Sequence, residues 1–192
     1  MKKYKIIYAD PPWKLDISQN RPEWGDATYN TMTTDEICKL PIEKLADKDC
    51  VLFMWVTMPF IEDSMEVIKS WGFKYITCAF VWVKTNPKSK TVFSGLGKWV
   101  NGNAELCFLA KRGHPKRIEK NIKQIQVHPR RKHSKKPDFI RNEIVRLMGD
   151  LSRIELFARE RMEGWDCFGD ETPTSEQKLL VSTNRDGNKS NK

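Results

Sequence analysis

Hydrophobic residues gather in five short runs, and polar segments with helical periodicity lie between some of them. Each run is rich in Ile, Val, Phe, Leu or Trp. The runs cover residues 4–9, 50–56, 75–83, 105–110 and 153–157. Several are apolar throughout rather than alternating, which is typical of strands covered on both faces. The pattern predicts a mostly parallel sheet in an α/β fold.

Three segments have the pattern of helices. Thr33–Glu36 has capping-box spacing, because a threonine side chain can accept from the third amide while the glutamate reaches back. Residues 59–71 and 137–148 each repeat large apolar side chains at three- and four-residue intervals and stop at a glycine. This alternation of strands and helices favours a doubly wound sheet flanked by helices, whose ligands lie at the carboxyl ends of the strands.

Three stretches depart from this alternation. Residues 14–32 and 84–104 are long, rich in Asn, Gly, Lys and Thr, and each follows a strand. Loops of this length in a compact domain usually serve a function. A chain of 192 residues fits one domain. We predict that this domain covers residues 1–171 and that residues 172–192 form a polar, disordered tail.

Composition removes several classes of protein. The longest apolar runs, 51–56 and 76–83, are far shorter than the ~20 residues of a membrane span, so no membrane association is expected. The five cysteines never form C-x-x-C, and the three histidines have no metal-binding spacing. Neither a disulfide framework nor a metal site is expected, and reduced thiols in a cytoplasmic protein are the default.

The net charge of +9 is concentrated in one segment. Residues 111–136 hold eleven Lys and Arg residues and one acid, whereas the other 166 residues hold 23 basic and 24 acidic groups. Such a segment suits a polyanion such as nucleic acid, and the alternative is a solvated basic loop. The candidate phosphate-binding residues in it are Lys111, Arg112, Arg130 and Arg131.

The tetrapeptide Asp10-Pro11-Pro12-Trp13 directly follows the first predicted strand. Neither proline has an N–H, so the strand must stop, and their fixed φ makes the turn stiff. The carbonyls of residues 10–12 can then point outward without backbone partners. A carboxylate, carbonyl acceptors and an indole face match the exocyclic amino group of a planar base. The alternative is a stiff turn with an N-terminal aspartate and a core tryptophan.

This motif and seven later segments resemble the MT-A70 family, the S-adenosylmethionine-dependent adenine-N6 methyltransferases of DNA and RNA. The later segments are 27–32, 53–57, 81–86, 99–105, 134–138, 155–159 and 164–171. The resemblance covers about residues 4–171 in the family's order. It implies a Rossmann-like methyltransferase fold with permuted motif order, which accounts for the absence of a G-x-G-x-x-G motif.

The resemblance also implies roles for individual residues. Asp10 and the carbonyls of Pro11 and Pro12 would accept the two N6 protons of adenine, and Trp13 would stack near the base. Residues implied near the substrate are Tyr29, Asn30 and Glu105. Residues implied to bind the donor, S-adenosylmethionine, are Asp10, Lys136, Phe157, Arg159, Asp170 and Glu171; among these, Lys136 would pair with the donor carboxylate.

Each assignment has a structural alternative. Lys136 is otherwise one more charge of the basic segment, and Glu105 is a partner for a nearby lysine. Arg159 is otherwise a surface residue, Asp170 and Glu171 are solvated acids, and Phe157 is a core residue. Trp99 and Trp165 are interpreted as packing or loop-anchoring residues. Asp170 also stands where relatives often have Asn, which weakens the expected contact with the donor ribose.

The main hypothesis is an adenine-N6 methyltransferase that acts on DNA, because no RNA-binding module is recognisable in the chain. The same chemistry on RNA is the first alternative. A non-catalytic nucleic-acid-binding partner subunit is the second, although the intact Asp10–Trp13 motif argues against it. A monomer, a homodimer and a heterodimer all remain open.

Overall fold

The computed structural model describes residues 2–14, 30–95, 99–131 and 135–169. Tyr29, Asp170, Glu171 and the predicted tail over 172–192 lie outside these residues. The strands are β1 (Tyr4–Ala9), β2 (Ala46–Val56), β3 (Lys74–Thr85), β4 (Ala104–Arg112), β5 (Ile125–Pro129), β6 (Arg153–Leu156) and β7 (Asp166–Phe168). The α-helices are α1 (Thr34–Cys38), α2 (Ile61–Ser70) and α3 (Phe139–Met148), and the 3₁₀ helices are η2 (Ile42–Lys44) and η3 (Met58–Phe60).

The strands form one seven-stranded sheet in the order β5-β3-β4-β2-β1-β6-β7. Strand β4 runs antiparallel to both of its neighbours, β2 and β3, while every other neighbouring pair is parallel. Six strands therefore point the same way, and β4 alone is reversed in the middle of the sheet. The predicted fold class, a mostly parallel Rossmann-like α/β sheet, is confirmed.

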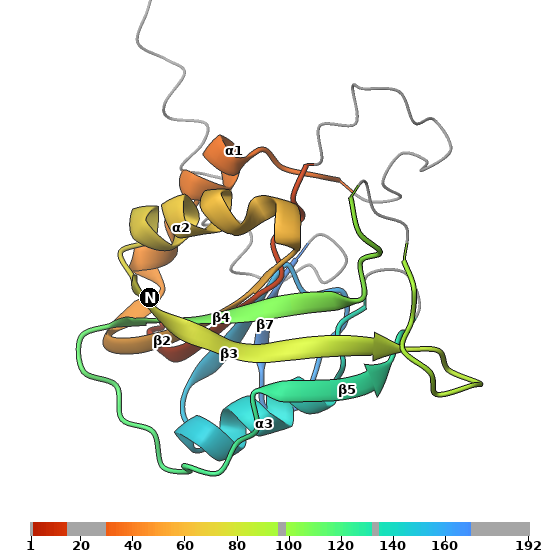
Figure 1. The fold of residues 1–192 in the computed structure, drawn as a ribbon. Coiled ribbons are helices and arrows are strands. Elements are labelled where there is room, and N and C mark those ends of the chain that lie inside the picture. Colours follow the sequence, from red (N-terminus) through yellow and green to blue (C-terminus); the bar gives the residue numbers. More distant parts are fainter. Residues whose placement is uncertain (1, 15–29, 96–98, 132–134, 170–192) are drawn as a thin grey trace, which may run out of the picture.

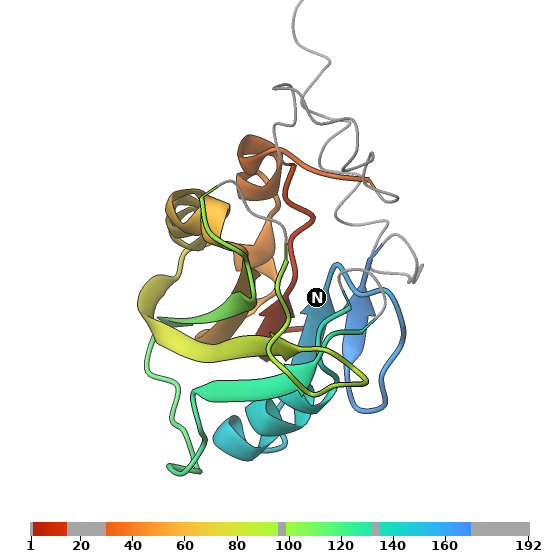
Figure 2. The ribbon, with the colours of Figure 1, turned by 45° about the vertical axis from the view of Figure 1, so that its right-hand side comes forward.

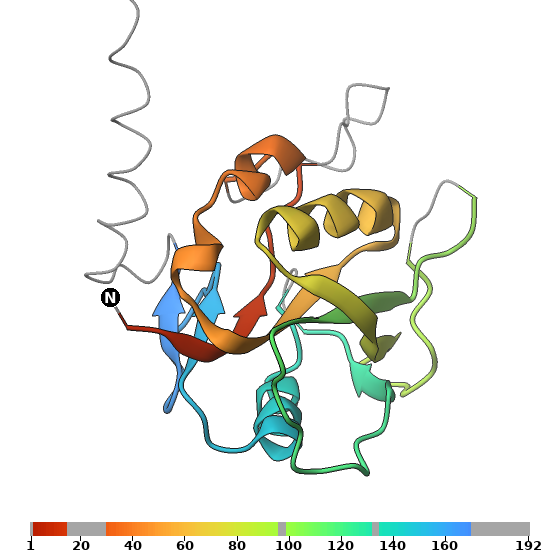
Figure 3. The same cartoon turned by 90° about the vertical axis from the view of Figure 1, so that its left-hand side faces the viewer.

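Helices cover both faces of this sheet. Figures 1 and 3 show α1 and α2 on one face and α3 on the other. Alternate residues of β1 supply the two halves of the core: Ile7 packs in the cluster that contains Ile37 of α1, and Ile6 packs in the cluster that contains Ile140 of α3. This double burial is the physical reason that the strands are apolar throughout.

The predicted elements are present with small shifts at their ends. The capping box at Thr33 is confirmed, with the Thr33 side chain accepting from the Glu36 amide and the Glu36 carboxylate accepting from the Thr33 amide. Helices α2 and α3 begin two residues later than predicted. The 3₁₀ helix η3 precedes α2, and Asp138 stands at the N-cap position of α3 without a side-chain capping bond. Within the described residues, no helix is long and apolar enough to span a bilayer.

Two strands, β5 and β7, were missed by the hydrophobic pattern. Both are short and lie at the two edges of the sheet. Strand β5 lies inside the basic segment, and its exposed Ile125 and Val127 alternate with polar residues. An edge strand needs only one neighbour and little burial, so its sequence carries a weak apolar signal.

The six parallel strands end at one edge of the sheet, which we call the carboxyl edge. Asp10 follows β1 there, Arg130 follows β5, and Phe157 follows β6. Because β4 is reversed, its first residues lie at this edge and its last residues at the opposite edge. Figure 2 shows the connection between β3 and β4 extending from this edge.

Candidate active site

The Asp10–Trp13 corner turns the chain sharply at the end of β1. The Pro11 carbonyl accepts a hydrogen bond from the Trp13 amide at 2.9 Å, and the Pro12 carbonyl accepts one from the Met32 amide at 2.8 Å. The prediction that these carbonyls lack backbone partners is therefore wrong for Pro11 and Pro12. A carbonyl oxygen has two lone pairs, so each can still accept a second donor.

Trp13 belongs to the hydrophobic core, with 8% of its area exposed. Its ring stacks on Phe60 with centroids 5.3 Å apart and planes 17° apart. Its indole N–H donates to the carbonyl of Trp55 at 3.4 Å. The structure therefore matches the alternative in which Trp13 is a core residue, and the indole fixes the corner against β2 and η3.

Asp10 ends a chain of four alternating charges. The Lys136 ammonium lies 2.7 Å from Asp10 Oδ2 and 3.2 Å from Glu105 Oε2. The other Glu105 oxygen accepts from Lys84 Nζ. The Lys136 and Glu105 side chains are each 11% exposed, whereas that of Asp10 is 27% exposed. Asp10 is therefore the end of the network that opens toward solvent.

Four separate segments of the chain bring this network together. Lys84 lies near the end of β3, and Glu105 lies near the start of β4, where it pairs in register with Trp82. Lys136 comes from the segment before α3, and its ammonium lies 5.7 Å from the centre of the Trp55 ring. The reversal of β4 is what carries a glutamate from the middle of the sequence to the end of β1.

Sequence reasoning missed Lys84. The signal was the two-residue period of a strand, which places Lys84 on the same face as Trp82. Trp82 is 2% exposed, so the lysine that follows it on this face also needs a partner. The structure matches the alternative in which Glu105 pairs with nearby lysines. It does not match the alternative for Lys136, a solvated charge of the basic segment, because Lys136 is paired with Asp10 and Glu105.

The electrostatics of the network differ from group to group. Burial raises the pKa of Asp10, and the ammonium of Lys136 only partly opposes this. Burial would likewise raise the pKa of Glu105, but Lys136 and Lys84 together lower it. Burial disfavours charge on Lys136, yet the two carboxylates hold its pKa above the ordinary value. Glu105 and Lys136 are therefore firmly ionised, and Asp10 is the most readily protonated acid of the site.

The turn after β6 adds a second group of residues at the same edge. Phe157 has φ of +60°, a left-handed conformation that is rare for a bulky residue. Its side chain is partly buried against the core, and Arg159 is exposed two residues later. The charge of Arg159 lowers the pKa of Asp10 slightly, which is consistent with a position on the same side of the molecule.

A buried ion pair involves Glu155, two residues before Phe157. Arg141 of α3 donates two hydrogen bonds of 2.7 Å to the two carboxylate oxygens of Glu155 on β6. Both side chains are 9% exposed. The pair therefore fixes α3 to the strand that leads into Phe157.

The four candidate phosphate-binding residues are divided between two edges of the sheet. Arg130 and Arg131 are exposed at the carboxyl edge, where Arg130 lies over the Phe93 ring at 4.3 Å and Arg131 pairs with Asp138. Lys111 and Arg112 end β4 at the opposite edge, about 20 and 23 Å from Glu105 at the rise of an extended strand. The structure does not bring these two pairs together. Asn30, the other described residue of the substrate group, is exposed.

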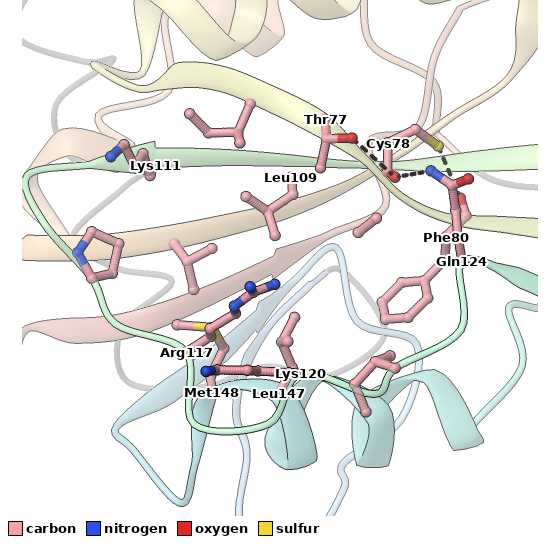
Figure 4. A pocket seen from close by; sticks show the side chains of 15 residues that line it. Thr77, Cys78, Phe80, Leu109, Lys111, Arg117, Lys120, Gln124, Leu147 and Met148 are labelled. Atoms are coloured by element: carbon pink, nitrogen blue, oxygen red, sulfur yellow. Dashed lines mark hydrogen bonds between the residues drawn. The ribbon is translucent and has the colours of Figure 1, made fainter.

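A cavity of about 490 Å³ lies away from the charge network (Figure 4). It is lined by the first half of β3, the chain after β4 and the end of α3, and three cations surround it. These cations are Lys111, Arg117 and Lys120. Because none of the carboxyl-edge residues lines it, this cavity is separate from the candidate active site.

The sequence of the chain is similar to those of known methyltransferases. The MT-A70 family model matches residues 4–171. The chain is 33% identical to the type II methyltransferase M.MunI of Mycoplasma sp, over 98% of this chain and 86% of that protein. It is 34% identical to the human N(6)-adenosine-methyltransferase catalytic subunit METTL3 over 88% of this chain, and 33% identical to an Arabidopsis thaliana N(6)-adenosine-methyltransferase MT-A70-like protein over 88%. The chain spans 28% and 24% of the lengths of those two proteins.

Proposed function

The chain belongs to the MT-A70 family, and from this premise we propose that it is an S-adenosylmethionine-dependent methyltransferase that modifies the N6 amine of adenine in DNA. The observation that carries the proposal is the buried charge network that ends in Asp10 beside two carbonyl acceptors at the carboxyl edge. Ligands of open α/β sheets bind at this edge.

Asp10 is the proposed acceptor for one N6 proton of the target base. The N6 lone pair of adenine is delocalised into the ring, so the amine is a poor nucleophile. A carboxylate that accepts from N6–H favours a pyramidal nitrogen and stabilises the positive charge that develops on it. The neutral amine needs no prior deprotonation, so Asp10 acts as a fixed acceptor rather than as a strong base.

The two prolines supply a rigid second acceptor. Their ring-locked φ angles and the backbone bonds to Trp13 and Met32 hold both carbonyl oxygens in place. The second lone pair of one of these oxygens is the proposed acceptor for the other N6 proton. A preorganised acceptor does not have to reorient during the reaction, which is the source of its catalytic effect.

Lys136 and Glu105 are the proposed positioning residues for Asp10. The ammonium holds Oδ2 at 2.7 Å, and Glu105 and Lys84 in turn fix the ammonium. Lys136 opposes the rise in the pKa of Asp10 that burial causes, and so favours the ionised carboxyl. A hydrogen-bond acceptor that is both fixed and ionised is what the N6 amine requires.

The charges at the carboxyl edge suit the proposed donor. S-adenosylmethionine carries a carboxylate, an ammonium and a sulfonium, and this edge offers the acids Asp10 and Glu105 and the cations Lys136 and Arg159. When bound, the donor supplies the methyl group. Of the donor set that the resemblance implies, Phe157 and Arg159 lie after β6, and Asp10 and Lys136 lie in the charge network, where Lys136 pairs with Asp10 and Glu105. Asp170 and Glu171 lie outside the described residues and are proposed from the resemblance alone.

DNA is favoured over RNA as the substrate because of how the relatives align. M.MunI and this chain match along most of both lengths, whereas the relatives named for adenosine, a ribonucleoside, match along about a quarter of theirs. The exposed arginines at the carboxyl edge suit the phosphates of either polymer. An RNA substrate is the alternative.

One assay separates these alternatives. The protein is incubated with labelled donor and with single-stranded DNA, duplex DNA and RNA of matched sequence, followed by nucleoside analysis. N6-methyldeoxyadenosine is the expected product. Methylated adenosine from RNA alone would replace the DNA proposal with the alternative, and no methylated nucleoside from any of the three would remove the proposed activity.

The divided basic residues lead to a prediction about salt dependence. Replacing Arg130 and Arg131 by alanine removes two exposed cations from the carboxyl edge. If both contact phosphates, the slope of log K against log salt becomes less negative by about 1.8 for duplex DNA. Oligonucleotide affinity measured between 50 and 250 mM salt tests this expectation.

The matched control is the alanine replacement of Lys111 and Arg112. This pair carries the same charge but lies at the opposite edge of the sheet. The control should leave the salt slope unchanged. If the control and the Arg130/Arg131 variant flatten the slope equally, the nucleic acid does not bind at the carboxyl edge alone.

A further inference from the structure

The connection between β3 and β4 carries exposed apolar side chains beyond the carboxyl edge. Trp99 is 92% exposed and Val100 is 78% exposed. The interpretation of Trp99 as a packing residue is therefore wrong. For Trp165 it is confirmed, since that side chain is 9% exposed and its ring centre lies 5.8 Å from that of Tyr8. An indole with so little burial contributes nothing to the core and is available to a ligand.

The segments on either side of Trp99 are tied to each other. The hydrogen bonds that join them are Lys84 N to Asn103 O at 2.8 Å, Gly95 N to Gly102 O at 3.1 Å and Asn101 Nδ2 to Ser94 Oγ at 2.8 Å. A further bond, Phe93 N to Lys84 O at 2.8 Å, lies within the segment before Trp99. A Cβ on Gly95 would lie 2.4 Å from the Gly102 carbonyl, so a glycine is needed for this close approach. These bonds anchor residues 84–95 and 99–103, which we call the stem. Trp99 is therefore presented on an anchored segment, which lowers the entropy cost of using it in binding.

This stem is continuous with the charge network of the active site. Lys84 belongs to both, since its amide and carbonyl bond the stem while its ammonium bonds Glu105. Trp99 lies six positions before Glu105, which limits their backbone separation to about 20 Å. Figures 1 and 2 show this connection leaving the end of β3 and returning to the start of β4. Since Lys136 joins Glu105 to Asp10, a strand whose adenine reaches Asp10 can extend toward Trp99 with its neighbouring nucleotides.

The charge around Trp99 identifies the kind of ligand. Residues 86–103 contain no acidic residue, and Lys88 and Lys90 are exposed on the stem. The guanidinium of Arg130 lies 4.3 Å from the centre of the Phe93 ring at its base. Exposed aromatic rings among cations are the arrangement with which proteins bind unpaired nucleotides, since the ring stacks on a base while the cations bind phosphates.

We propose that Trp99 is a base-stacking residue that binds a nucleotide flanking the target adenine on the same strand. This inference rests on the proposed function, because it takes the polymer at Asp10 to be a nucleic acid. The stacked base positions the strand so that the adenine beside it enters the Asp10 site. Trp99 thus acts in substrate binding and does not touch the donor.

The test compares three substitutions at Trp99 in the full chain. Kd is measured by fluorescence anisotropy with a labelled single-stranded oligodeoxynucleotide containing one adenine. Trp99→Ala should weaken binding roughly tenfold or more, the cost of losing one stacked base. Trp99→Phe should keep most of the affinity, whereas Trp99→Leu, which retains apolar area without an aromatic face, should lose it as alanine does.

Two further measurements separate stacking from other roles. The salt slope should not change in Trp99→Ala, because no charge is removed. Donor affinity measured by calorimetry should also be unchanged. The matched control is Val92→Ala, which shortens another exposed apolar side chain of the stem and should leave the oligonucleotide Kd unaltered.

The opposing outcomes are distinct. If Trp99→Ala binds as tightly as the unaltered chain, or if leucine restores full affinity, base stacking is overturned while the proposed activity stands. Unaltered oligonucleotide binding together with a changed mass in sedimentation would instead mean that a second copy of the chain covers Trp99. If the unaltered protein neither binds nor methylates any of the three nucleic acids, the proposed function fails and this inference fails with it.

Discussion

Asp10→Asn is expected to lower kcat for methyl transfer by about 10²–10³-fold, the typical cost of removing one preorganised group that stabilises transition-state charge. Asparagine keeps the size of the side chain but not its charge. Glu105 still pairs with Lys136 at 3.2 Å, so the buried ammonium keeps a counter-charge and the fold should persist. Transfer rates with saturating donor and oligonucleotide measure the effect.

Binding measurements provide the control for this substitution. Oligonucleotide affinity should survive in Asp10→Asn, and Asp35→Asn, which removes an exposed acid of α1, should retain full activity. An Asp10→Asn enzyme with normal kcat would show that another group accepts the hydrogen bond from N6, and the proposed role of the corner would be wrong.

The pH dependence of the unaltered enzyme gives a second check on Asp10. Only the ionised carboxylate is the proposed acceptor, and burial raises its pKa above the ordinary value of 3.8. A raised pKa means that the proton binds at a higher pH, so activity should fall on acidification with a midpoint above that value. A profile of kcat/KM against pH reports the ionisation in the free enzyme. Full activity down to the ordinary aspartate range would contradict the assignment.

Arg141→Met is expected to have the largest effect on stability, about 3–5 kcal/mol of the free energy of unfolding. The substitution leaves the Glu155 carboxylate buried without the guanidinium that now donates two hydrogen bonds to it. For a chain of this length the loss corresponds to a decrease in Tm on the order of 10 °C. Urea unfolding followed by circular dichroism measures it.

The double variant Arg141→Met/Glu155→Gln is the matched control. Removing both charges also removes the uncompensated carboxylate, so much of the lost stability should return. If the double variant is as unstable as the single one, lost packing of the arginine rather than an unpaired acid is the cause.

The pH dependence of the single variant has a defined sign. Burial already raises the pKa of Glu155 while Arg141 opposes it, so losing Arg141 raises the pKa further. The folded state then binds a proton more tightly than the unfolded state, and stability falls as pH rises. The instability of Arg141→Met should therefore be smaller at mildly acidic pH than at pH 8.

Most of the sheet and the helices could be predicted from the sequence, because buried segments have apolar patterns in consecutive residues. Strand β1 was predicted with its observed ends, and the capping box at Thr33 is present as expected. Strand β5 was missed because an edge strand with exposed Ile125 and Val127 needs no continuous apolar run. The exposure of Trp99 could not be predicted either, because no pattern in the neighbouring residues distinguishes an exposed tryptophan from a packed one.

The amino-acid sequence alone determined the α/β class, the stiff corner at Asp10 and the likeness to adenine methyltransferases. Each of these depends on features that can be seen in the sequence itself: apolar periodicity, the fixed geometry of proline and the order of motifs. Only the tertiary structure decided which charges meet. Glu105 reaches the carboxyl edge because β4 is reversed within the sheet, and there it meets Lys84 at the end of β3 and Lys136, which bonds Asp10. The same reversal sends Lys111 and Arg112 to the far edge. Ion pairs between distant segments depend on strand order and direction, which hydrogen bonding across the whole sheet sets and no single segment encodes.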